Sequence, residues 1–233
     1  MKGLRVGIDL DGTLADLSAG YHDVERRLFG VESQPEAVDE TGADPAEVVE
    51  ERDKKADLKA ARAAAAHRDI VWQALRSTRD FWTTLKPVEV GVIRKLHDVS
   101  RARGWEVYFL TQRPATVGET VQRQSQLWLR EHGFELPTVL TLAGARGRVA
   151  AALELDALID DLPKNCVDVI SDSKCRPLLV LRRTDATAEA AAKGLRIGVV
   201  RSVDEGIDIL ASDAADTETE TVMQRVWRHL GLA

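Results

Sequence analysis

Two carboxylates stand close together near the start of the chain, where an apolar run ends. Residues 4–14 read LRVGIDLDGTL, so Asp9 and Asp11 flank one leucine and precede a glycine and a threonine. Paired carboxylate oxygens suit a hard cation such as Mg²⁺, and the same pair offers one group as a nucleophile and the other as a proton donor. The alternative is plainer, because Asp-Gly is also a common turn after a strand.

Two further apolar segments end in chemically similar residues. Thr111 ends the segment at 105–111, and Asp160 and Asp161 end the segment at 156–161. Sites in an open parallel sheet form outside the carboxyl ends of its strands, so these distant residues are expected to converge. Four carboxylates in one crevice repel one another unless a cation lies among them. For Asp160 and Asp161, the alternative is a simple cap for the next helix.

The segments that must carry these residues alternate with helical patterns. In residues 4–10, apolar positions alternate with polar or small ones, as in a buried strand. Helices are expected between the later strands, at 88–103, 116–132 and 144–153, and again after a capping box at 202–205. Further strands are expected at 105–111, 138–142, 156–161, 177–181 and 196–200. This βαβ spacing predicts an α/β fold with a Rossmann-like parallel sheet and helices on both faces.

The stretch between the first two strands breaks this alternation. Asp16 is placed to cap a helix that ends at Gly30, and Asp44 begins a second helix that continues into the alanine-rich run at 59–66. Residues 67–76 carry a further helical pattern, and no strand pattern occurs between 15 and 80. We therefore predict an inserted all-helical cap at 15–86 and a core made of residues 1–14 and 87–233.

The composition limits the class of partner. With 44% hydrophobic and 30% charged residues and a net charge of −6, the chain has an ordinary globular composition. No block of lysine or arginine indicates a nucleic-acid partner, and no apolar run reaches membrane-spanning length. Cys166 and Cys175 match no zinc or redox spacing, so we expect reduced thiols and a cytoplasmic protein. The oligomeric state stays open.

The motifs resemble those of the haloacid dehalogenase (HAD) superfamily of phosphohydrolases. Residues 9–14 match its first motif, Thr111 its second and residues 159–161 its fourth, in the family's order. The place of the predicted cap is similar to the helical-cap class, and residues 81–87 and 160–165 resemble the deoxyribonucleotidase-like branch. The resemblance implies a Mg²⁺-dependent phosphomonoester hydrolase that acts on a small phosphorylated metabolite.

The resemblance also implies a role for each matched residue. Asp9 would attack phosphorus to give an aspartyl-phosphate intermediate, and Asp11 would protonate the leaving oxygen and then activate water. Mg²⁺ would be held by Asp9, by the backbone carbonyl of Asp11, and by Asp160 or Asp161. Catalytic Thr111 and the backbone amides after Asp9 would hold phosphate oxygens. The residues expected to bind substrate are Gly12, Thr13, Gln112 and Arg113 in these two loops, and Arg148 further along the chain.

The sequence departs from the family at the third motif, which is usually a lysine on the helix before the fourth motif. That helix contains no lysine; Arg146 lies nearest the expected place and Arg148 second. Arginine supplies the same charge, although its planar fork has a different reach from an ammonium. The alternative is that both arginines are solvated surface charges.

These residues favour one function and leave others open. A phosphatase for a nucleoside monophosphate is favoured, with a sugar phosphate as the next substrate. The missing lysine favours a non-catalytic or regulatory protein that binds a phosphorylated ligand, and phosphotransfer to an alcohol is a further alternative. Trp72, Phe81 and Trp82 lie at the return from the predicted cap to the core, where they would either stack on a nucleobase or pack in the interior.

Overall fold

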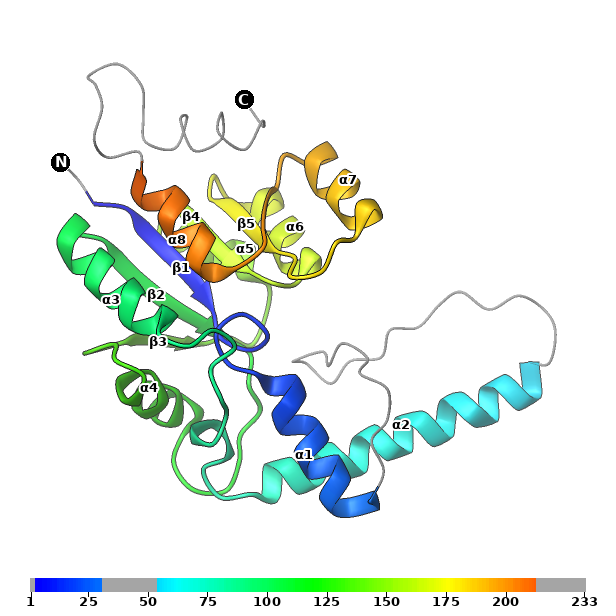
Figure 1. Ribbon diagram of the computed structural model, residues 1–233. Helices are drawn as coiled ribbons and strands as arrows, with labels where there is room; N and C mark the ends of the chain where they lie inside the picture. Colours follow the sequence, from blue (N-terminus) through cyan, green and yellow to red (C-terminus); the bar gives the residue numbers. More distant parts are fainter. Residues whose placement is uncertain (1–2, 31–53, 213–233) are drawn as a thin grey trace.

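A six-stranded parallel sheet lies at the centre of the computed structural model, which describes residues 3–30 and 54–212 (Figure 1). The strand order is β3-β2-β1-β4-β5-β6, and every neighbouring pair runs parallel. The strands are β1 (Arg5–Asp9), β2 (Glu106–Thr111), β3 (Thr138–Thr141), β4 (Ala157–Asp160), β5 (Arg176–Val180) and β6 (Gly198–Val200). The predicted Rossmann-like α/β sheet is confirmed.

Helices cover both faces of this sheet (Figure 1). Val6 and Ile8 point into the cluster on one face, whereas Leu110 and Leu158 point into the cluster on the other. Strands buried on both faces need nearly continuous apolar runs, which is why these segments read as they do. The first layer consists of α3 (Val92–Arg103), α4 (Val121–Glu131) and α8 (Val203–Ser212), and the second of α5 (Arg146–Ala152), α6 (Pro163–Asp172) and α7 (Ala186–Gly194).

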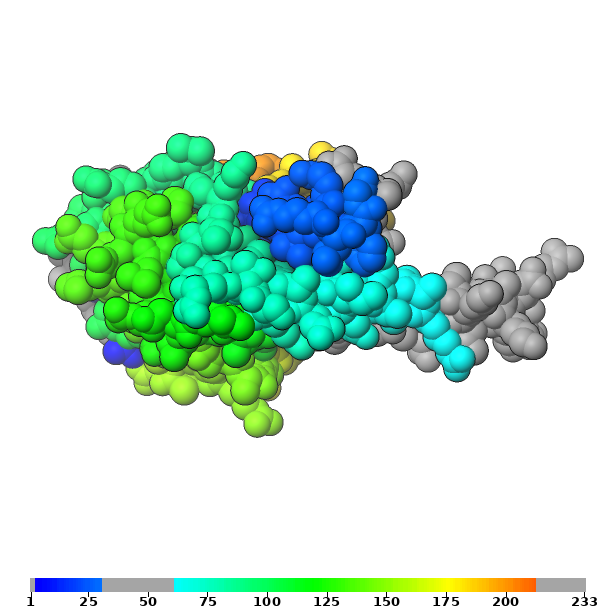
Figure 2. All heavy atoms as spheres, turned by 90° about the horizontal axis from the view of Figure 1, so that it is seen from below, coloured from blue at the N-terminus to red at the C-terminus, as the bar shows by residue number. Residues whose placement is uncertain are grey.

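Two more helices, α1 (Leu17–Phe29) and α2 (Lys54–Ser77), pack against each other beyond the carboxyl ends of the strands (Figures 1 and 2). Asp16 caps α1 as predicted, since its carboxylate accepts the Ala19 amide at 2.9 Å, and Gly30 ends the helix at a φ of 70°. The helix start predicted at Asp44 lies outside the described residues.

The described residues between β1 and α3 contain α1, α2 and the short helix η1 (Phe81–Thr83), and no strand. Helix α2 is continuous through residues 59–76, where the sequence analysis predicts a helix and a separate helical pattern. Backbone hydrogen bonds of 2.8 Å, from Asp16 to Lys86 and from Val88 to Leu14, hold the two ends of this insertion together. The division into a core and a cap at residues 15–86 stays a prediction.

Two predicted helix starts are wrong. Helix α4 begins at Val121 rather than at 116, because the Thr120 hydroxyl accepts the Arg123 amide and caps the helix there. Helix α3 begins at Val92 rather than at 88, after Gly91 with a φ of 83°. At α8, the Ser202 hydroxyl accepts the amide of Glu205 as the predicted capping box requires. In the sequence, Val222, Val226 and Leu230 form a further helical pattern, which lies outside the described residues.

Cys166 and Cys175 are both buried and form no disulfide. In the described part of the chain, no helix is both long and apolar enough to cross a membrane.

Helix α5 approaches α6 so closely that one residue between them must be glycine. A Cβ built on Gly147 would lie 2.3 Å from the backbone oxygen of Asp168, and the Gly147 amide donates to the Asp168 carboxylate at 3.1 Å. This contact fixes the first turn of α5 and with it the orientation of the preceding residue, Arg146.

Replacing Gly147 with alanine is expected to lower the free energy of unfolding by roughly 1–3 kcal/mol, because overpacking outweighs the gain in helix propensity of about 1 kcal/mol. The control is Gly194→Ala at the end of α7, where a Cβ meets nothing within 4 Å. Urea unfolding followed by tryptophan fluorescence measures both variants. Equal midpoints and slopes for the two would contradict this packing.

Candidate active site

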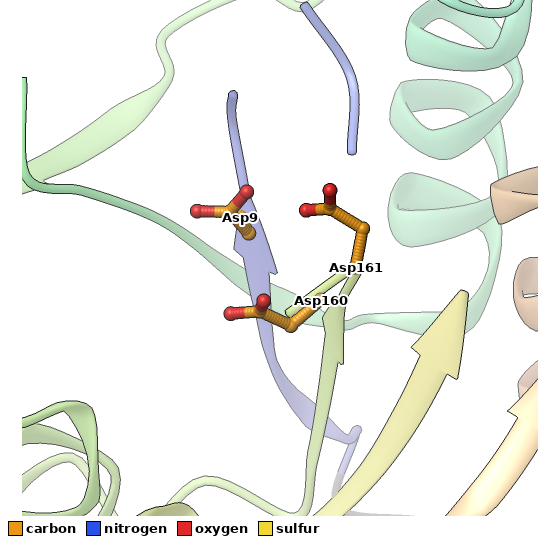
Figure 3. Close-up of side chains that lie close together, drawn as sticks. All are labelled: Asp9, Asp160 and Asp161. Carbon is orange, nitrogen blue, oxygen red and sulfur yellow. The ribbon is translucent and has the colours of Figure 1, made fainter. Parts of the chain in front are cut away.

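Three carboxylates converge at the carboxyl ends of β1 and β4 (Figure 3). Asp9 is the last residue of β1, Asp160 is the last residue of β4, and Asp161 follows it. Each contributes one oxygen to a group whose members all lie within 4.8 Å of one another. Asp9 and Asp160 are fully buried, whereas Asp161 is partly exposed.

The sheet register produces this convergence. Strands β1 and β4 are neighbours, and Ile8 pairs with Ile159, so the next residue on each strand carries its carboxylate to the same place. The two motifs are about 150 positions apart in the sequence, and parallel pairing alone brings them side by side.

Burial raises the pKa of all three carboxyl groups. It raises the pKa of Asp9 to about 7 and that of Asp160 to about 6; in both, Arg146 partly opposes the rise and a neighbouring carboxylate adds to it. Burial likewise raises the pKa of Asp161 to about 7, with a further contribution from Asp9. The negative charge at this edge of the sheet is therefore poorly compensated by the protein itself.

Arg146 is a cation that faces Asp9 and Asp160. Its side chain is fully buried, and Nη1 lies 2.6 Å from Oδ1 of Asp9 and 3.3 Å from Oδ2 of Asp160. The same nitrogen donates to the Leu110 carbonyl at 3.3 Å. Arg148 is exposed. Of the two arginines that the sequence offers in place of the family's lysine, the structure brings Arg146 to the carboxylates.

The oxygens of this cluster fit a hard cation. Oδ1 of Asp160 accepts the Leu162 amide at 2.9 Å and the Asn165 side-chain amide at 3.2 Å. Apart from their ion pairs with Arg146, neither oxygen of Asp9 nor Oδ2 of Asp160 accepts a hydrogen bond from the described residues. Buried carboxylate oxygens without donors are the ligands that Mg²⁺ prefers.

Gly12 and Thr13 lie against Asp161. The Thr13 hydroxyl donates to Oδ1 of Asp161 at 2.8 Å and accepts the Asp161 amide at 3.1 Å. Gly12 has a φ of 83°, and a Cβ built on it would lie 2.2 Å from the Asp161 carboxylate. Both residues are predicted to bind substrate. The Thr13 hydroxyl instead orients Asp161, and the Gly12 amide donates to the Ala15 carbonyl at 2.8 Å, so a phosphate contact through the Thr13 amide stays a prediction.

Asp11 belongs to a separate ion pair. Nε and Nη2 of Arg113 lie 2.7 Å and 2.6 Å from the two oxygens of the Asp11 carboxylate, and both side chains are fully buried. The Thr111 hydroxyl donates to the same carboxylate at 3.3 Å. The Asp11 carboxylate is therefore absent from the three-acid group, and its backbone carbonyl as a metal ligand stays a prediction.

Arg113 differs from its expected role at the substrate. Nε and Nη2 donate to Asp11, and Nη1 donates to the Ser125 hydroxyl at 2.9 Å. With every guanidinium nitrogen already bound to a protein oxygen, the side chain orients Asp11 instead of reaching outward. Gln112, also predicted at the substrate, donates to the Gly144 carbonyl at 2.8 Å and so holds the loop before α5.

Sequence reasoning misses Arg182. Its guanidinium donates to the carbonyls of Gly12 and Thr13 at 2.7 Å and 2.8 Å and pairs with Glu89 at 3.2 Å. Arg182 follows β5. Sites in a parallel sheet form at the carboxyl ends of its strands, and the reasoning that identifies Asp160 therefore also applies to this position.

The three aromatic residues at the return to the core are interior residues. Trp72, Phe81 and Trp82 have 6%, 3% and 0% of their surface exposed. Of the two alternatives for these side chains, packing is confirmed, and none of the three is free to stack on a ligand.

No protein-family model matches this sequence, and no curated protein matches it. Solved structures do match. A phosphonoacetaldehyde hydrolase-like protein from Oleispira antarctica is 15% identical with a TM-score of 0.52, and the match covers 99% of this chain and 94% of that one. A HAD family hydrolase from Deinococcus radiodurans R1, with bound phosphate and sodium, is 16% identical with a TM-score of 0.51 over 89% of this chain and 95% of that one. A hydrolase from Pseudomonas syringae is 12% identical with a TM-score of 0.52 over 91% and 100%.

The chain shares the α/β fold of these hydrolases. Identities this low establish a shared fold, so the reaction must be inferred from the residues of this site.

The acidic cluster is expected to make the stability of the metal-free protein depend on pH. The folded pKa values exceed the ordinary value of 3.8, so the folded protein binds these protons more tightly than the unfolded chain. That stabilisation is complete below an ordinary carboxyl pKa and is lost as the pH rises through about 6 to 7. With a chelator present, the Tm should therefore fall between pH 5 and pH 8.

Adding Mg²⁺ should raise the Tm more at pH 8 than at pH 5, because a cation binds the ionised cluster. Asp9→Asn should reduce both the pH dependence and the Mg²⁺ response. Differential scanning fluorimetry measures each variant, with Asp98→Asn on the surface of α3 as the control. A Mg²⁺ response that is the same in Asp9→Asn and the wild type would contradict the assignment of the site.

Proposed function

We propose that this protein is a Mg²⁺-dependent phosphomonoester hydrolase that uses Asp9 as its nucleophile. The observation that carries the proposal is the buried Asp9 carboxylate, which has Asp160 and Asp161 on one side and Arg146 at 2.6 Å on the other. The three acids outnumber the two guanidinium groups that act on them, those of Arg146 and Arg182, so an anionic phosphate needs a further cation there. The fold shared with hydrolases, one of them holding bound phosphate, supports this proposal.

In the first half of the reaction, an oxygen of Asp9 attacks phosphorus and forms an acyl phosphate while the ester P–O bond breaks. Asp11 donates a proton to the departing oxygen, so the alcohol leaves neutral. In the second half, Asp11 takes a proton from a water that attacks phosphorus, the bond between Asp9 and phosphorus breaks, and inorganic phosphate leaves. Each half returns Asp11 to the protonation state that the other half needs.

Two cations are proposed to compensate the negative charge of Asp9 and the phosphate. Arg146 neutralises Asp9 and one side of the phosphate, and its bond to the Leu110 carbonyl fixes the guanidinium. Mg²⁺, held by Asp9, Asp160 and Asp161 together with the Asp11 carbonyl, would supply Lewis-acid stabilisation of the phosphate oxygens. The Thr13 amide is proposed to donate to a remaining oxygen. The Thr111 hydroxyl, which donates to Asp11 in this structure, is proposed to turn to a phosphate oxygen when substrate binds.

The proposed substrate is a small phosphorylated metabolite, since α1 and α2 lie beyond the strand ends and are proposed to cover the site as a helical cap. A nucleoside monophosphate is favoured by the resemblance of residues 81–87 and 160–165 alone. The interior positions of Trp72, Phe81 and Trp82 give it no further support. Sugar phosphates are therefore to be screened beside nucleotides.

A non-catalytic phospho-ligand-binding protein is the alternative that the missing lysine favours. Arg146 weakens that argument, because a buried cation already faces the would-be nucleophile. The four acids that the reaction needs are all present at the strand ends.

Hydrolysis of p-nitrophenyl phosphate, with and without Mg²⁺, tests the proposal. We expect Mg²⁺-dependent turnover that Asp9→Asn lowers by about 10³-fold or more, since no other group of the site replaces an attacking carboxylate. Asp98→Asn, with a carboxylate 62% exposed on α3, is the control and should keep full activity. A wild-type protein that binds phosphoesters without turning them over would favour the binding protein instead.

Arg146 and Arg148 provide a matched pair of substitutions. Arg146→Met removes the cation between two buried carboxylates and is expected to lower kcat/KM by about 10²–10³-fold, and Arg146→Lys should recover part of that loss. Arg148→Met, two residues away and exposed, should change kcat/KM by less than about twofold. Similar losses in the two methionine variants would show that Arg146 has no special role.

A further inference from the structure

Trp82 lies in η1, the segment through which the chain returns from α2 to the core, and it is fully buried. The Arg113 guanidinium carbon lies 4.8 Å from the centre of its ring, within the range of a cation–π contact. The indole N–H donates to the carbonyl of Pro114, the next residue after Arg113, at 3.0 Å. The Trp82 amide donates to Gln124 of α4 at 3.1 Å. One side chain thus contacts both the head group of Arg113 and the backbone beside it.

Arg113 in turn determines the orientation of Asp11. Its Nε and Nη2 donate hydrogen bonds to the Asp11 carboxylate, and its Nη1 donates to the Ser125 hydroxyl. A guanidinium is planar, so fixing its plane also fixes the plane of the carboxylate that it binds through two nitrogens. Trp82, Arg113 and Asp11 form a continuous buried chain from η1 to the group proposed to donate the proton.

The loop after Arg113 is joined to the end of α2 along its length. The Val117 amide donates to Arg76 at 2.9 Å, the Asp80 amide donates to Val117 at 2.7 Å, and the Asp80 carboxylate accepts the Glu119 amide at 2.7 Å. Asp80 adopts a left-handed φ of 52° to make these contacts. The position of Arg113 therefore depends on the segment at 76–83 as well as on the core.

We propose that Trp82 is a positioning residue for Asp11. It holds Arg113 in the plane that presents the Asp11 carboxylate to the leaving oxygen, and it makes the end of α2 part of the proton-donating apparatus. This inference rests on the proposed function, because it assigns Trp82 to the proton transfer of that reaction. Proton transfer depends strongly on geometry, and a misplacement of about 1 Å costs on the order of 10²-fold in rate.

The test compares Trp82→Phe with Trp128→Phe. Trp128 is an equally buried tryptophan, whose indole N–H donates to the Leu85 carbonyl at 2.7 Å and whose ring lies 4.6 Å from that of His132. Each substitution removes one buried indole hydrogen bond and leaves an aromatic ring, so both should lower the Tm similarly. Of the two, Trp82 is the one in contact with Arg113.

Two substrates separate positioning from general damage. p-Nitrophenyl phosphate has a weakly basic leaving group that needs little protonation, whereas an alkyl phosphate such as glycerol phosphate depends on the acid. We expect Trp82→Phe to lower kcat on the alkyl ester by about tenfold or more and on the nitrophenyl ester by less than about threefold. Trp128→Phe should lower both by the same factor.

Equal losses on both substrates in Trp82→Phe would overturn the inference while leaving the proposed hydrolase intact. A wild-type protein inactive on both would overturn the proposed function and this inference with it. Should Trp82→Phe not fold, Ser125→Ala, which removes the acceptor of Arg113 Nη1, must show the same preferential loss on the alkyl ester. A uniform loss in that variant would count equally against the inference.

Discussion

Asp9 and Asp160 end adjacent strands in a fully buried position, where each carboxylate is deprived of water and faces the other. Like charges at this distance in a low-dielectric interior strongly oppose their own ionisation. Arg146 offsets part of that cost through ion pairs to both groups. The remaining negative charge suits the site to a cation, and an anionic phosphate would need that cation beside it.

Strand register and two glycines position these carboxylates and Arg146. The register of β1 with β4 places the two acids together, and the absence of a side chain at Gly147 lets α5 approach α6 so that Arg146 reaches them. On the opposite side, Gly12 leaves room for the Asp161 carboxylate, which a side chain there would displace. Each is a small steric requirement, and together they fix the distances on which the charge balance depends.

Two carboxylates separated by one residue acquire different surroundings. Asp9 lies among other acids and Arg146, whereas Asp11 is enclosed by Arg113, Thr111 and the aromatic ring of Trp82 behind Arg113. Distinct environments for neighbouring carboxyl groups are how one site assigns a nucleophile and a proton donor. On the proposed mechanism, the segment between α2 and the core would influence the proton transfer without carrying a reacting group.

The sequence predicts the sheet, the caps of α1 and α8, and the convergence of Asp9 with Asp160. Strand periodicity and capping residues are local signals, and sites in a parallel sheet form at the carboxyl ends of its strands. The pairing of Asp11 with Arg113 could not be predicted, since the two lie 102 residues apart and either would be reasonable at a phosphate.

Arg146 and Arg148 differ in burial only through the packing of α5, a helix of 7 residues and too short for a clear apolar stripe. The late start of α4 has a similar cause, because the contacts that keep residues 114–119 out of the helix come from η1 and the end of α2.

The central claim is that Asp9 receives the phosphoryl group. Rapid acid quenching of the protein during turnover, followed by peptide mass spectrometry, tests it most directly. The account predicts a phosphorylated peptide containing Asp9, formed only when Mg²⁺ and substrate are both present and lost on treatment with hydroxylamine. Turnover with no phosphorylated peptide, or with the phosphate on a peptide that lacks Asp9, would contradict it.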